Sequence, residues 1–522
     1  MTKPLIPVVD LFAGPGGLGE GFSALENGQA FRIVVSAEKD PIAHETLRLR
    51  AFFRLLKTKL PEGLADYYAY CNGESDTPFS ERTKKLWCEA ENEALCIILG
   101  TEDGNAKLDA AIHQRLGQDT GKEPWILIGG PPCQAYSLVG RARNKGKVDY
   151  SAETDDRNFL YKEYLRIINR YKPAMFIMEN VKGMLSATVG GGRIFHEILQ
   201  DLATPARAFP GETDNPRYKI CSLVSDQHFE ADGDPTKMNA NAFIIQAEHY
   251  GVPQARHRVI LVGIREDYNH HDIAKLQPQP FLNVEDVIDA LPKLRSRLSK
   301  EPDSAANWQR RVAEQLTCVS EEARKADMIA VATKLDKVCP ELIKHSEFGG
   351  IRVLRDDKAS TGMPTLDRWF EDKQLQFWLN HETRGHRIDD LGRYAFAAAF
   401  AEIHKRSPKG HTEFNLPILV PAHKNWESGK FSDRFRVQTR YGPSSTVTSH
   451  ISKDGHYFIH YDPSQCRSLT VREAARLQTF PDNYFFLGGR TQQYHQVGNA
   501  VPPFLANQIA AIVYGYLTTQ QE

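Results

Sequence analysis

The sequence predicts an α/β fold in which helices cover a mostly parallel sheet and a smaller domain of mixed structure follows. Short apolar runs alternate with amphipathic stretches over residues 5–265, as expected when helices connect parallel strands. Near residue 270 this pattern gives way to Pro-containing turns, charged helical stretches and a Thr/Ser/aromatic run, and helical periodicity returns near residue 468. A chain of 522 residues is long enough for about two to four domains.

The elements of the first region follow from short apolar runs bounded by turn residues. Strands are expected at Ile6–Phe12, Phe31–Ser36, Trp125–Ile128, Met175–Met178, Tyr218–Val224, Ala242–Ala247 and Val259–Ile264. Helices are expected at Leu18–Glu26, Ile42–Leu56, Leu160–Tyr171 and Gly192–Leu202, and later at Ser468–Gln478 and Pro503–Leu517. Between about residues 57 and 122 a polar, helix-prone segment replaces a tight connection, which predicts an insertion. We therefore expect one domain over residues 1–270 with this insertion, a second over 271–465, and a carboxyl-terminal segment over 466–522.

The composition excludes several classes of protein. Hydrophobic residues make up 41% and charged residues 25% of the chain, which excludes a collagen-like fibre, a disordered tail and a small disulfide-stapled scaffold. The eight cysteines are scattered, with no CxxC pair and no zinc-like spacing, so we expect reduced thiols and no metal site. No stretch approaches the roughly 18 apolar residues of a membrane helix, and the amino terminus leads directly into a strand pattern. These features predict a cytoplasmic protein with no membrane segment.

The net charge of −1 conceals two basic segments. The chain has 65 Lys and Arg residues against 66 Asp and Glu residues, and an even distribution would argue against a nucleic-acid partner. Residues 139–150, however, carry four basic residues against one acidic residue, a net charge of +3. Residues 404–454 carry nine against four, a net charge of +5. Because an average can hide a basic groove, nucleic acid is not excluded.

A strand that ends in a glycine-rich turn opens the first domain. In VVDLFAGPGG, residues 8–17, the glycines Gly14, Gly16 and Gly17 permit positive φ and a close approach of the backbone to a ligand. Such a turn is also common as a plain structural connection. Glu38 ends the next predicted strand, where a carboxylate can accept both hydroxyls of a ribose or can simply be solvated. Together the two features favour a nucleoside cofactor.

A second loop at the same sheet edge presents a cysteine. The run WILIGGPPCQAYS, residues 125–137, delivers Cys133 at the tip of a proline-stiffened loop. A lone cysteine is most often inert core, but its neighbours Gln134 and Tyr136 are not typical of core. The basic segment that follows contains Arg141 and Arg143. It is either a solvated loop or a clamp for phosphates that closes over a substrate.

Two further strand ends carry polar side chains. The fourth predicted strand ends in FIMENV and places Glu179 and Asn180 at its carboxyl end, where the carboxylate either caps a helix or acts as an acid or base in a cleft. Gln254, Arg256 and Arg258 alternate at the start of another strand, so all three are expected on one face. That face is either a solvent edge or a binding site for a polar base or a phosphate.

In their order along the chain, these motifs resemble the DNA cytosine-5 methyltransferases of prokaryotic stand-alone type. The matching set is DLFAGPGG (10–17), Glu38, GGPPCQAYS (129–137), DDRNFLYKEY (155–164), MENV (178–181), QARHRV (254–259), SLTVREAARLQTFPD (468–482) and QVGNAVPP (496–503). The resemblance implies a Rossmann-like domain that binds S-adenosylmethionine and a smaller, mixed target-recognition domain. It also implies that the carboxyl-terminal segment packs back onto the catalytic domain.

The resemblance also implies roles for individual residues. Cys133 would add as a thiolate to carbon 6 of a flipped-out cytosine, which activates carbon 5 for methylation. Glu179 would hold N3 and the exocyclic amine, and Arg258, supported by Arg256, would bind O2 or a phosphate. The implied cofactor-binding residues are Phe12, Gly14, Pro15, Gly16, Glu38, Leu160, Asn499 and Val501. The implied DNA-binding residues are Gln134, Ser137, Arg141, Arg143 and Gln254.

One departure from the family pattern affects the cofactor. The family has a short Gly-Asp-Ile-like motif that contacts adenine, whereas this chain offers only LGTEDGN, residues 99–105. The residue that contacts adenine is therefore not assigned.

Double-stranded DNA is the expected partner of a monomeric enzyme, and any cognate restriction endonuclease would be encoded separately because the chain holds no convincing nuclease motif.

Two alternatives stay open. A tRNA cytosine-5 methyltransferase shares the motifs, but roughly 200 residues separate QARHRV from SLTVREAARLQ, more than a compact RNA enzyme needs. An inactive DNA-binding homologue would lack some of the chemical positions, all of which are present. The first motif begins at residue 10, which predicts no amino-terminal chromatin-reading domain.

Overall fold

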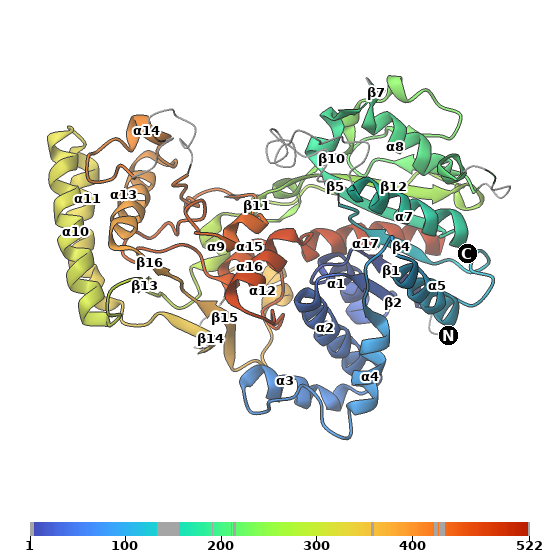
Figure 1. Ribbon diagram of the computed structural model, residues 1–522, viewed down its shortest axis with the longest axis horizontal. Coiled ribbons are helices and arrows are strands. Elements are labelled where there is room, and N and C mark those ends of the chain that lie inside the picture. Colours follow the sequence, from blue (N-terminus) through green and yellow to red (C-terminus); the bar gives the residue numbers. More distant parts are fainter. Residues whose placement is uncertain are drawn as a thin grey trace.

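The computed structural model describes residues 5–132, 156–189, 192–209, 211, 216–355, 360–421, 426 and 434–519. A sheet domain lies on one side of the molecule and a largely helical domain on the other, with carboxyl-terminal helices between them (Figure 1). This arrangement agrees with the α/β fold and the smaller mixed domain expected from the sequence.

A nine-stranded sheet forms the centre of the first domain. Its strands are β1 (Ile6–Leu11), β2 (Phe31–Glu38), β3 (Ala94–Cys96), β4 (Ile126–Gly129), β5 (Met175–Val181), β8 (Tyr218–Cys221), β9 (His228–Phe229), β10 (Ile244–Gln246) and β12 (His257–Arg265). The order is β3-β2-β1-β4-β5-β12-β8-β9, and β10 also pairs with β12. The strands from β3 to β5 are parallel, whereas β12 runs antiparallel to β5, β8 and β10. All seven predicted strands are present, and β3 and β9 are additional.

The register of the parallel strands brings their carboxyl ends to one edge. Leu11 of β1 lies opposite Gly129 of β4, and Gly129 lies opposite Met178 of β5. Glu38 ends β2 beside β1. The glycine-rich turn, Glu38, the turn after β4 and Glu179 therefore share this edge, as the sequence predicts.

Helices cover both faces of the sheet. Apolar side chains of β1 divide between the faces: Ile6 and Val8 join a core with α1 (Gly17–Ala24) and α17 (Pro503–Thr519). Val9 and Leu11 join the opposite core with α5 (Glu102–Leu116), α7 (Asp156–Tyr171) and α8 (Ile194–Ala203). Burial on both faces explains why these strands are continuously apolar in the sequence.

The segment from residue 57 to residue 122, expected as an insertion, is only partly outside the sheet. It contains α3 (Leu64–Asn72) and α4 (Lys84–Glu93), then β3 and α5. Because β3 pairs with β2 and α5 packs on the same core, only residues 57–93 lie outside the sheet architecture.

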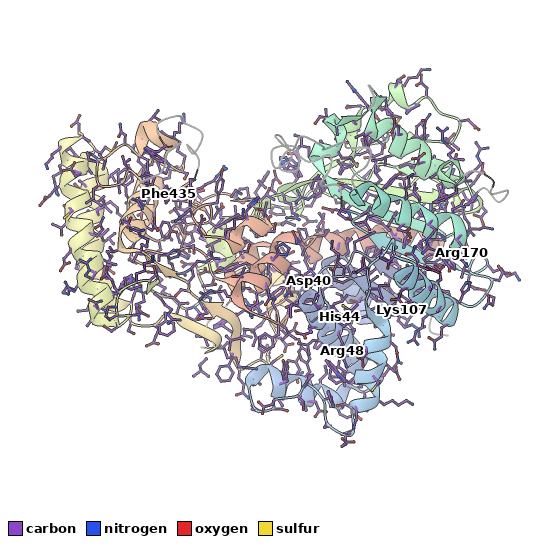
Figure 2. The ribbon with its side chains drawn as sticks, in the orientation of Figure 1. Asp40, His44, Arg48, Lys107, Arg170 and Phe435 are labelled. Carbon is purple, nitrogen blue, oxygen red and sulfur yellow. The ribbon has the colours of Figure 1, made fainter. Side chains whose placement is uncertain are left out.

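Helix α2 (Pro41–Lys59) connects the sheet to this added segment. Asp40 caps its first turn, and His44 and Arg48 follow at successive turns, as Figure 2 shows. The His44 ring contacts the Ala94 carbonyl at 2.9 Å, and the Arg48 guanidinium lies 4.0 Å from the Trp87 ring centroid. One side of α2 therefore holds both α4 and β3.

The second domain is built around helices α10 (Ala305–Lys325), α11 (Ile329–Val338) and α13 (Ile388–His404), with an antiparallel pair of strands, β14 (Gly349–Leu354) and β15 (Phe377–Glu382). The short helices α9 (Val284–Ile288) and α12 (Pro364–Phe370) complete its framework. Its core also includes side chains of α15 (Val471–Leu477) and α16 (Arg490–Asn499). The carboxyl-terminal segment is therefore shared: α15 and α16 belong to the core of the second domain, and α17 packs on α1.

The stretch Arg490–Thr519 is long and apolar enough to span a membrane by composition alone. It contains two helices, α16 and α17, separated between Asn499 and Pro503. Because α17 fills the sheet core with Leu505, Ile509 and Val513, its apolar character is that of a core helix.

Candidate active site

The turn after β1 has the backbone conformation that its glycines permit. Gly14 and Gly16 have φ of 57° and 99°, and Phe12 also has a positive φ of 58°. A side chain at Gly14 would meet nothing within 4 Å, so the space above this turn is open. The turn is supported from below by Tyr484, whose hydroxyl donates to the Pro15 carbonyl.

Glu38 holds the glycine-rich turn next to the end of β2. Its carboxylate accepts the N–H of Gly14 and the N–H of Asp40, each at 2.8 Å. A half-exposed carboxylate in contact with the turn is suitably placed for a ribose at this edge.

Leu160 lies across from the segment that replaces the family's adenine motif. Its Cδ2 atom is 3.8 Å from the position of a side chain at Gly100. Ile98, between β3 and Gly100, is 58% exposed. The sequence motif gives no role to Ile98, because its place after β3 and its exposure cannot be read from the motif.

Two close backbone contacts explain the glycines around the carboxyl-terminal motif. A side chain at Gly17 would lie 2.3 Å from the Val501 carbonyl oxygen, and one at Gly498 would lie 2.3 Å from the Thr448 carbonyl carbon. Val501 is therefore held against the start of α1, beside the glycine-rich turn. Asn499, at the end of α16, is exposed, and its amide contacts His495 at 3.2 Å.

Asp10 is a buried acid at the same edge that sequence reasoning did not single out. It lies near the end of β1 and is 1% exposed. Burial raises the pKa of Asp10 to about 8. Only the fold reveals this environment, because an Asp that ends a strand is usually solvated.

An ion pair joins the two predicted base-binding residues. Arg258 Nε lies 2.9 Å from Glu179 Oε1, with the two side chains 16% and 13% exposed. Their strands, β5 and β12, are antiparallel neighbours, and Ile260 lies opposite Glu179. The side-chain position of Gly130 is 3.1 Å from Glu179 Oε2, so the pair adjoins the turn that leads to Cys133.

Asn180 fixes the start of that turn. Its Nδ2 atom donates to the Pro131 carbonyl at 3.1 Å, and the side chain is buried. The predicted residues Cys133, Gln134, Ser137, Arg141 and Arg143 lie outside the residues that the structure describes.

Gln254 has a different position from the one expected, and its predicted role in DNA contact needs correction. The side chain has no exposed surface. Its amide nitrogen, Nε2, donates to the Leu477 carbonyl at 3.1 Å and to Gln478 Oε1 at 2.7 Å. Its amide oxygen, Oε1, accepts the Val447 N–H at 2.8 Å. Because both ends of the amide are engaged inside the protein, Gln254 holds the domains together and has no surface with which to meet DNA.

Arg256 is also buried. It is 3% exposed and donates to the Val447 carbonyl at 2.9 Å. Burial and the charge of Arg258 lower the pKa of Arg256 well below its usual range. Because two like charges repel, Arg256 cannot support Arg258 by its charge, and its contribution is to hold Val447 in place.

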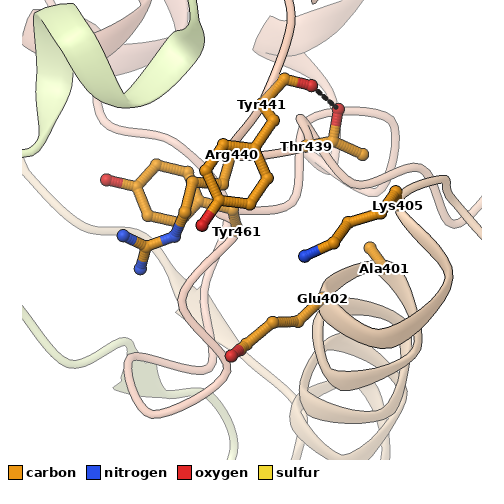
Figure 3. Close-up of a pocket in the computed structure, with 7 residues that line it drawn as sticks. All are labelled: Ala401, Glu402, Lys405, Thr439, Arg440, Tyr441 and Tyr461. Atoms are coloured by element: carbon orange, nitrogen blue, oxygen red, sulfur yellow. Dashed lines mark hydrogen bonds between the residues drawn. The ribbon is translucent and has the colours of Figure 1, made fainter.

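The late basic segment is partly neutralised by nearby carboxylates. The ion pairs are Arg406–Glu413 at 2.6 Å, Arg434–Asp454 at 2.9 Å and Arg440–Glu285 at 3.1 Å. A small hollow in this segment is lined by aromatic and basic side chains (Figure 3). There Lys405 lies over the Tyr441 ring at 4.7 Å and Arg440 over the Tyr461 ring at 4.6 Å. Because Glu413 and Asp454 are already counted in the net charge of +5, only the Arg440–Glu285 pair of these three neutralises a further cation of this segment.

Among the described residues, no group of three or more His, Cys, Asp or Glu side chains is arranged to hold a metal ion.

Comparisons with known proteins agree with these features. The family model of the C-5 cytosine-specific DNA methylase matches residues 103–205 and 238–514. The type II methyltransferase M.Bpa9945I of Bacillus paralicheniformis is 33% identical over 524 residues, covering 97% of this chain and 98% of that protein. The type II methyltransferase M.AgeI of Thalassovita gelatinovora is 26% identical, with the same coverage of both chains.

More distant matches extend to an archaeon and to a solved structure. The DNA (cytosine-5-)-methyltransferase M.ApeKI of Aeropyrum pernix is 25% identical, covering 75% of this chain and 81% of that protein. A solved structure described as a DNA modification methyltransferase encoded within an E. coli prophage has a TM-score of 0.52 and 17% identity, covering 98% of this chain and 99% of that chain. That likeness concerns the fold. Since the family model matches more than half of the chain, this protein belongs to the C-5 cytosine-specific DNA methylase family and is a DNA (cytosine-5-)-methyltransferase of restriction-modification type.

Proposed function

We propose that this enzyme methylates carbon 5 of a flipped-out cytosine within a specific sequence of double-stranded DNA, with S-adenosylmethionine as the methyl donor and Cys133 as a transient nucleophile. The observation that carries the proposal is the Glu179–Arg258 ion pair beside the turn that leads to Cys133. An acid and a guanidinium at that position suit the polar edge of a pyrimidine.

The residues at the sheet edge fit the cofactor. The open space above Gly14 and the carboxylate of Glu38 lie at the glycine-rich turn, and Val501 packs against Gly17 beside it. Leu160, which lies next to Gly100, is included because of the family resemblance. Phe12, Pro15, Gly16 and Asn499 complete the proposed set. When bound there, S-adenosylmethionine supplies an electrophilic methyl group.

The residues of the chain account for the remaining chemistry. Carbon 5 of cytosine is a weak nucleophile, so the Cys133 thiolate forms a bond to carbon 6 and the electron pair of the double bond moves toward carbon 5. Glu179 holds N3 and the exocyclic amine and places a proton where negative charge develops, while Arg258 binds O2 or the adjacent phosphate. After methyl transfer, a base removes the carbon-5 proton and the bond from carbon 6 to sulfur breaks, which releases the thiolate and 5-methylcytosine.

The enzyme must flip the target base out of the duplex to contact its reacting atoms. The reacting atoms of cytosine are covered by stacking in a duplex, so the base must leave the helix at a cost of a few kcal/mol. Gln134, Ser137, Arg141 and Arg143, in the loop after Cys133, are the residues that we propose to fill and close the site. Gln254 is not included, because it is buried.

The proposal is tested by expressing the protein in a host without cytosine-5 methylation. We expect 5-methylcytosine in the DNA of cells with the unchanged protein and none with Cys133→Ala, and bisulfite sequencing would give the target sequence. Methylation found only in tRNA would favour the tRNA alternative. Bound cofactor without any methylated product would favour an inactive homologue.

The proposal extends to partners and location. We propose a cytoplasmic monomer that acts on DNA alone, with any cognate endonuclease encoded separately. Methylation should decrease as salt increases, because phosphate contacts release counterions. The loop after Cys133 and the late basic segment should both contribute to that dependence, because both carry a net positive charge.

A further inference from the structure

The helical segment of residues 57–93 shares a core with the second domain. Tyr67, Tyr68 and Cys71 of α3 are buried together with Leu375 and Leu379 from the β15 region. Phe52 and Phe53 of α2 and Phe485 of the carboxyl-terminal segment belong to the same cluster. Three regions far apart in the sequence therefore meet in one apolar core at the side of the sheet domain that carries the glycine-rich turn.

The antiparallel strand pair of the second domain, β14 and β15, also binds the end of α3. Arg352 of β14 donates through Nε to the Cys71 carbonyl at 2.7 Å and through Nη2 to the Tyr70 carbonyl at 2.8 Å. The Gln376 N–H donates to Asn72 Oδ1 at 3.1 Å. Because the last carbonyls of a helix carry partial negative charge, a guanidinium is favoured at this position.

Asp372, at the centre of this contact, links three regions. Its Oδ2 atom accepts the Tyr68 hydroxyl from α3 and the Asn483 amide at 2.6 Å from the carboxyl-terminal segment. Its Oδ1 accepts the Gln374 N–H at 3.0 Å, and its backbone carbonyl accepts Arg355 at 3.0 Å. One carboxylate of the second domain thus binds both of its neighbours.

From Asn483 the hydrogen bonds continue to the glycine-rich turn. Asn483 Oδ1 accepts Arg50 Nη1 at 2.9 Å, and Arg50 pairs with Glu20 of α1 through two bonds of 2.8 and 2.6 Å. Arg50 and Glu20 are both buried. The next residue, Tyr484, donates to the Pro15 carbonyl within the turn itself.

We infer that Asp372 is a positioning residue for cofactor binding, which holds Asn483 and Tyr484 under the glycine-rich turn and thereby links that turn to the placement of the target-recognition domain. The inference rests on the proposed binding of S-adenosylmethionine at this turn. The carboxylate acts through Asn483 and Arg50 and does not touch the cofactor. Its loss leaves donors of Tyr68 and Asn483 without their acceptor, so the support beneath Pro15 loosens.

The test compares Asp372→Ala with two matched variants in the full-length protein. S-adenosylmethionine binding without DNA is measured by calorimetry, and the KM for cofactor and kcat are measured on DNA. Asp372→Ala should raise the cofactor Kd and KM by about fivefold or more, since bonds to a charged acceptor are lost. Asp372→Asn, which keeps an oxygen toward Tyr68 and Asn483, should restore most of the affinity.

The control for stability is Asp303→Ala. Asp303 is a half-buried acid whose partners Arg295, Arg297 and Leu298 all lie in the second domain. This variant should lower the melting temperature and leave the cofactor Kd within about twofold, as expected for a site without shared partners. A cofactor Kd that is unchanged in Asp372→Ala, or raised equally in Asp303→Ala, would overturn the inference.

Tyr68→Phe provides a second test if Asp372→Ala does not fold. It removes one hydroxyl and keeps the ring in the shared core, and it should raise the cofactor Kd by about threefold, as expected for one lost hydrogen bond. An unchanged Kd in this variant would also overturn the inference. If the unchanged protein itself binds no S-adenosylmethionine, the proposed function fails and the inference fails with it. If the unchanged protein binds the cofactor and the variants bind it with the same Kd, only the inference is refuted.

Discussion

Two regions of the molecule use the same kinds of polar side chain in opposite ways. At the open edge of the sheet, Glu179 and Arg258 form one ion pair with each other and keep part of their surface exposed. At the junction between the domains, Gln254 and Arg256 are buried. Gln254 bonds to the Leu477 carbonyl of α15 and to the Val447 N–H, and Arg256 donates to the Val447 carbonyl. These arginines are only two residues apart. The difference shows that one short motif can place one arginine at a partly exposed edge of the sheet and another in the contact between the domains.

The same division extends through the carboxyl-terminal segment. Arg467, Arg472 and Arg476 are each no more than 1% exposed. They bind Glu473, Asp482 and backbone carbonyls of the second domain and of the segment itself. Because each of these buried cations has acceptors inside the protein, they fix structure and are not available to DNA.

The largest expected effect is on turnover at the open edge. Glu179→Gln should reduce methyl transfer by about a hundred- to ten-thousandfold, the range for loss of an acid–base group, with little change in the melting temperature. Single-turnover methylation of an oligonucleotide and a thermal melt provide the two measurements. A rate within tenfold of the unchanged enzyme would contradict the assignment of this edge to the reaction.

The next effect is on stability at the junction. Arg476 pairs with Asp482 through two bonds of 2.9 and 2.8 Å and donates to the Val287 carbonyl at 2.7 Å. Arg476→Met should cost about 3–5 kcal/mol in the free energy of unfolding, because it leaves Asp482 buried without its partner. Chemical denaturation measures this loss. The exposed pair Arg310–Glu314 serves as the control, and Arg310→Met should leave the denaturation midpoint unchanged.

Gln254→Ala directly tests the corrected role of Gln254. The change leaves the Val447 N–H and the Leu477 carbonyl without their partner, which should cost about 2–3 kcal/mol in the free energy of unfolding. Because Val447 lies in the segment that joins the two domains, the KM for DNA should rise more than kcat falls. Denaturation and steady-state kinetics would separate the two. Loss of activity without loss of stability would instead indicate that Gln254 contacts DNA.

The smallest expected effect is a pH dependence of the junction. Burial lowers the pKa of His381 to about 4. Its Nε2–H donates to the Pro292 carbonyl and its Nδ1 faces the Thr470 hydroxyl, each at 2.9 Å, so the neutral ring is the form that fits. Since the unfolded chain takes up this proton near pH 6.5, the stability that the neutral ring provides is present above that pH and is lost as pH falls toward 4.

Between pH 7.5 and pH 5.5 the contribution of His381 should decrease by about 1 kcal/mol. Chemical denaturation across this range, compared with His381→Gln, isolates the effect from other buried histidines. Equal slopes for the two proteins would show that folding does not lower the pKa of His381.

Much of the sheet edge could be predicted from the sequence, because strand periodicity and glycine positions are local properties. The register of β1, β4 and β5 then brings the predicted turns together. The strand β3 was not predicted because three residues give no periodic signal. The division of labour between Arg256 and Arg258 was not predictable either. The partner of Arg256 lies 191 residues away, in a segment whose pattern does not reveal its contacts.

The residues under the glycine-rich turn illustrate the same limit. Tyr484 and Asn483 belong to an aromatic run after α15, and their spacing gives no indication of contacts with Pro15 and Arg50. Only the packing of α2 and of the glycine-rich turn against the segment after α15 brings these groups together. Local patterns therefore identified the chemical groups, whereas the groups that position them depended on contacts between distant segments.

The packing of α17 has a consequence for the order in which the protein can mature during synthesis. On one face of the sheet, Ile6 and Val8 of β1 and Phe22 of α1 share a core with Leu505, Ile509 and Val513 of α17. A ribosome makes about 480 residues between these two sets, at a rate of about 5–20 residues per second. For that interval of roughly half a minute or longer this core lacks α17, and its apolar side chains are covered only in part by α1. Full activity should therefore appear only after α17 has been made and has packed on this face of the sheet.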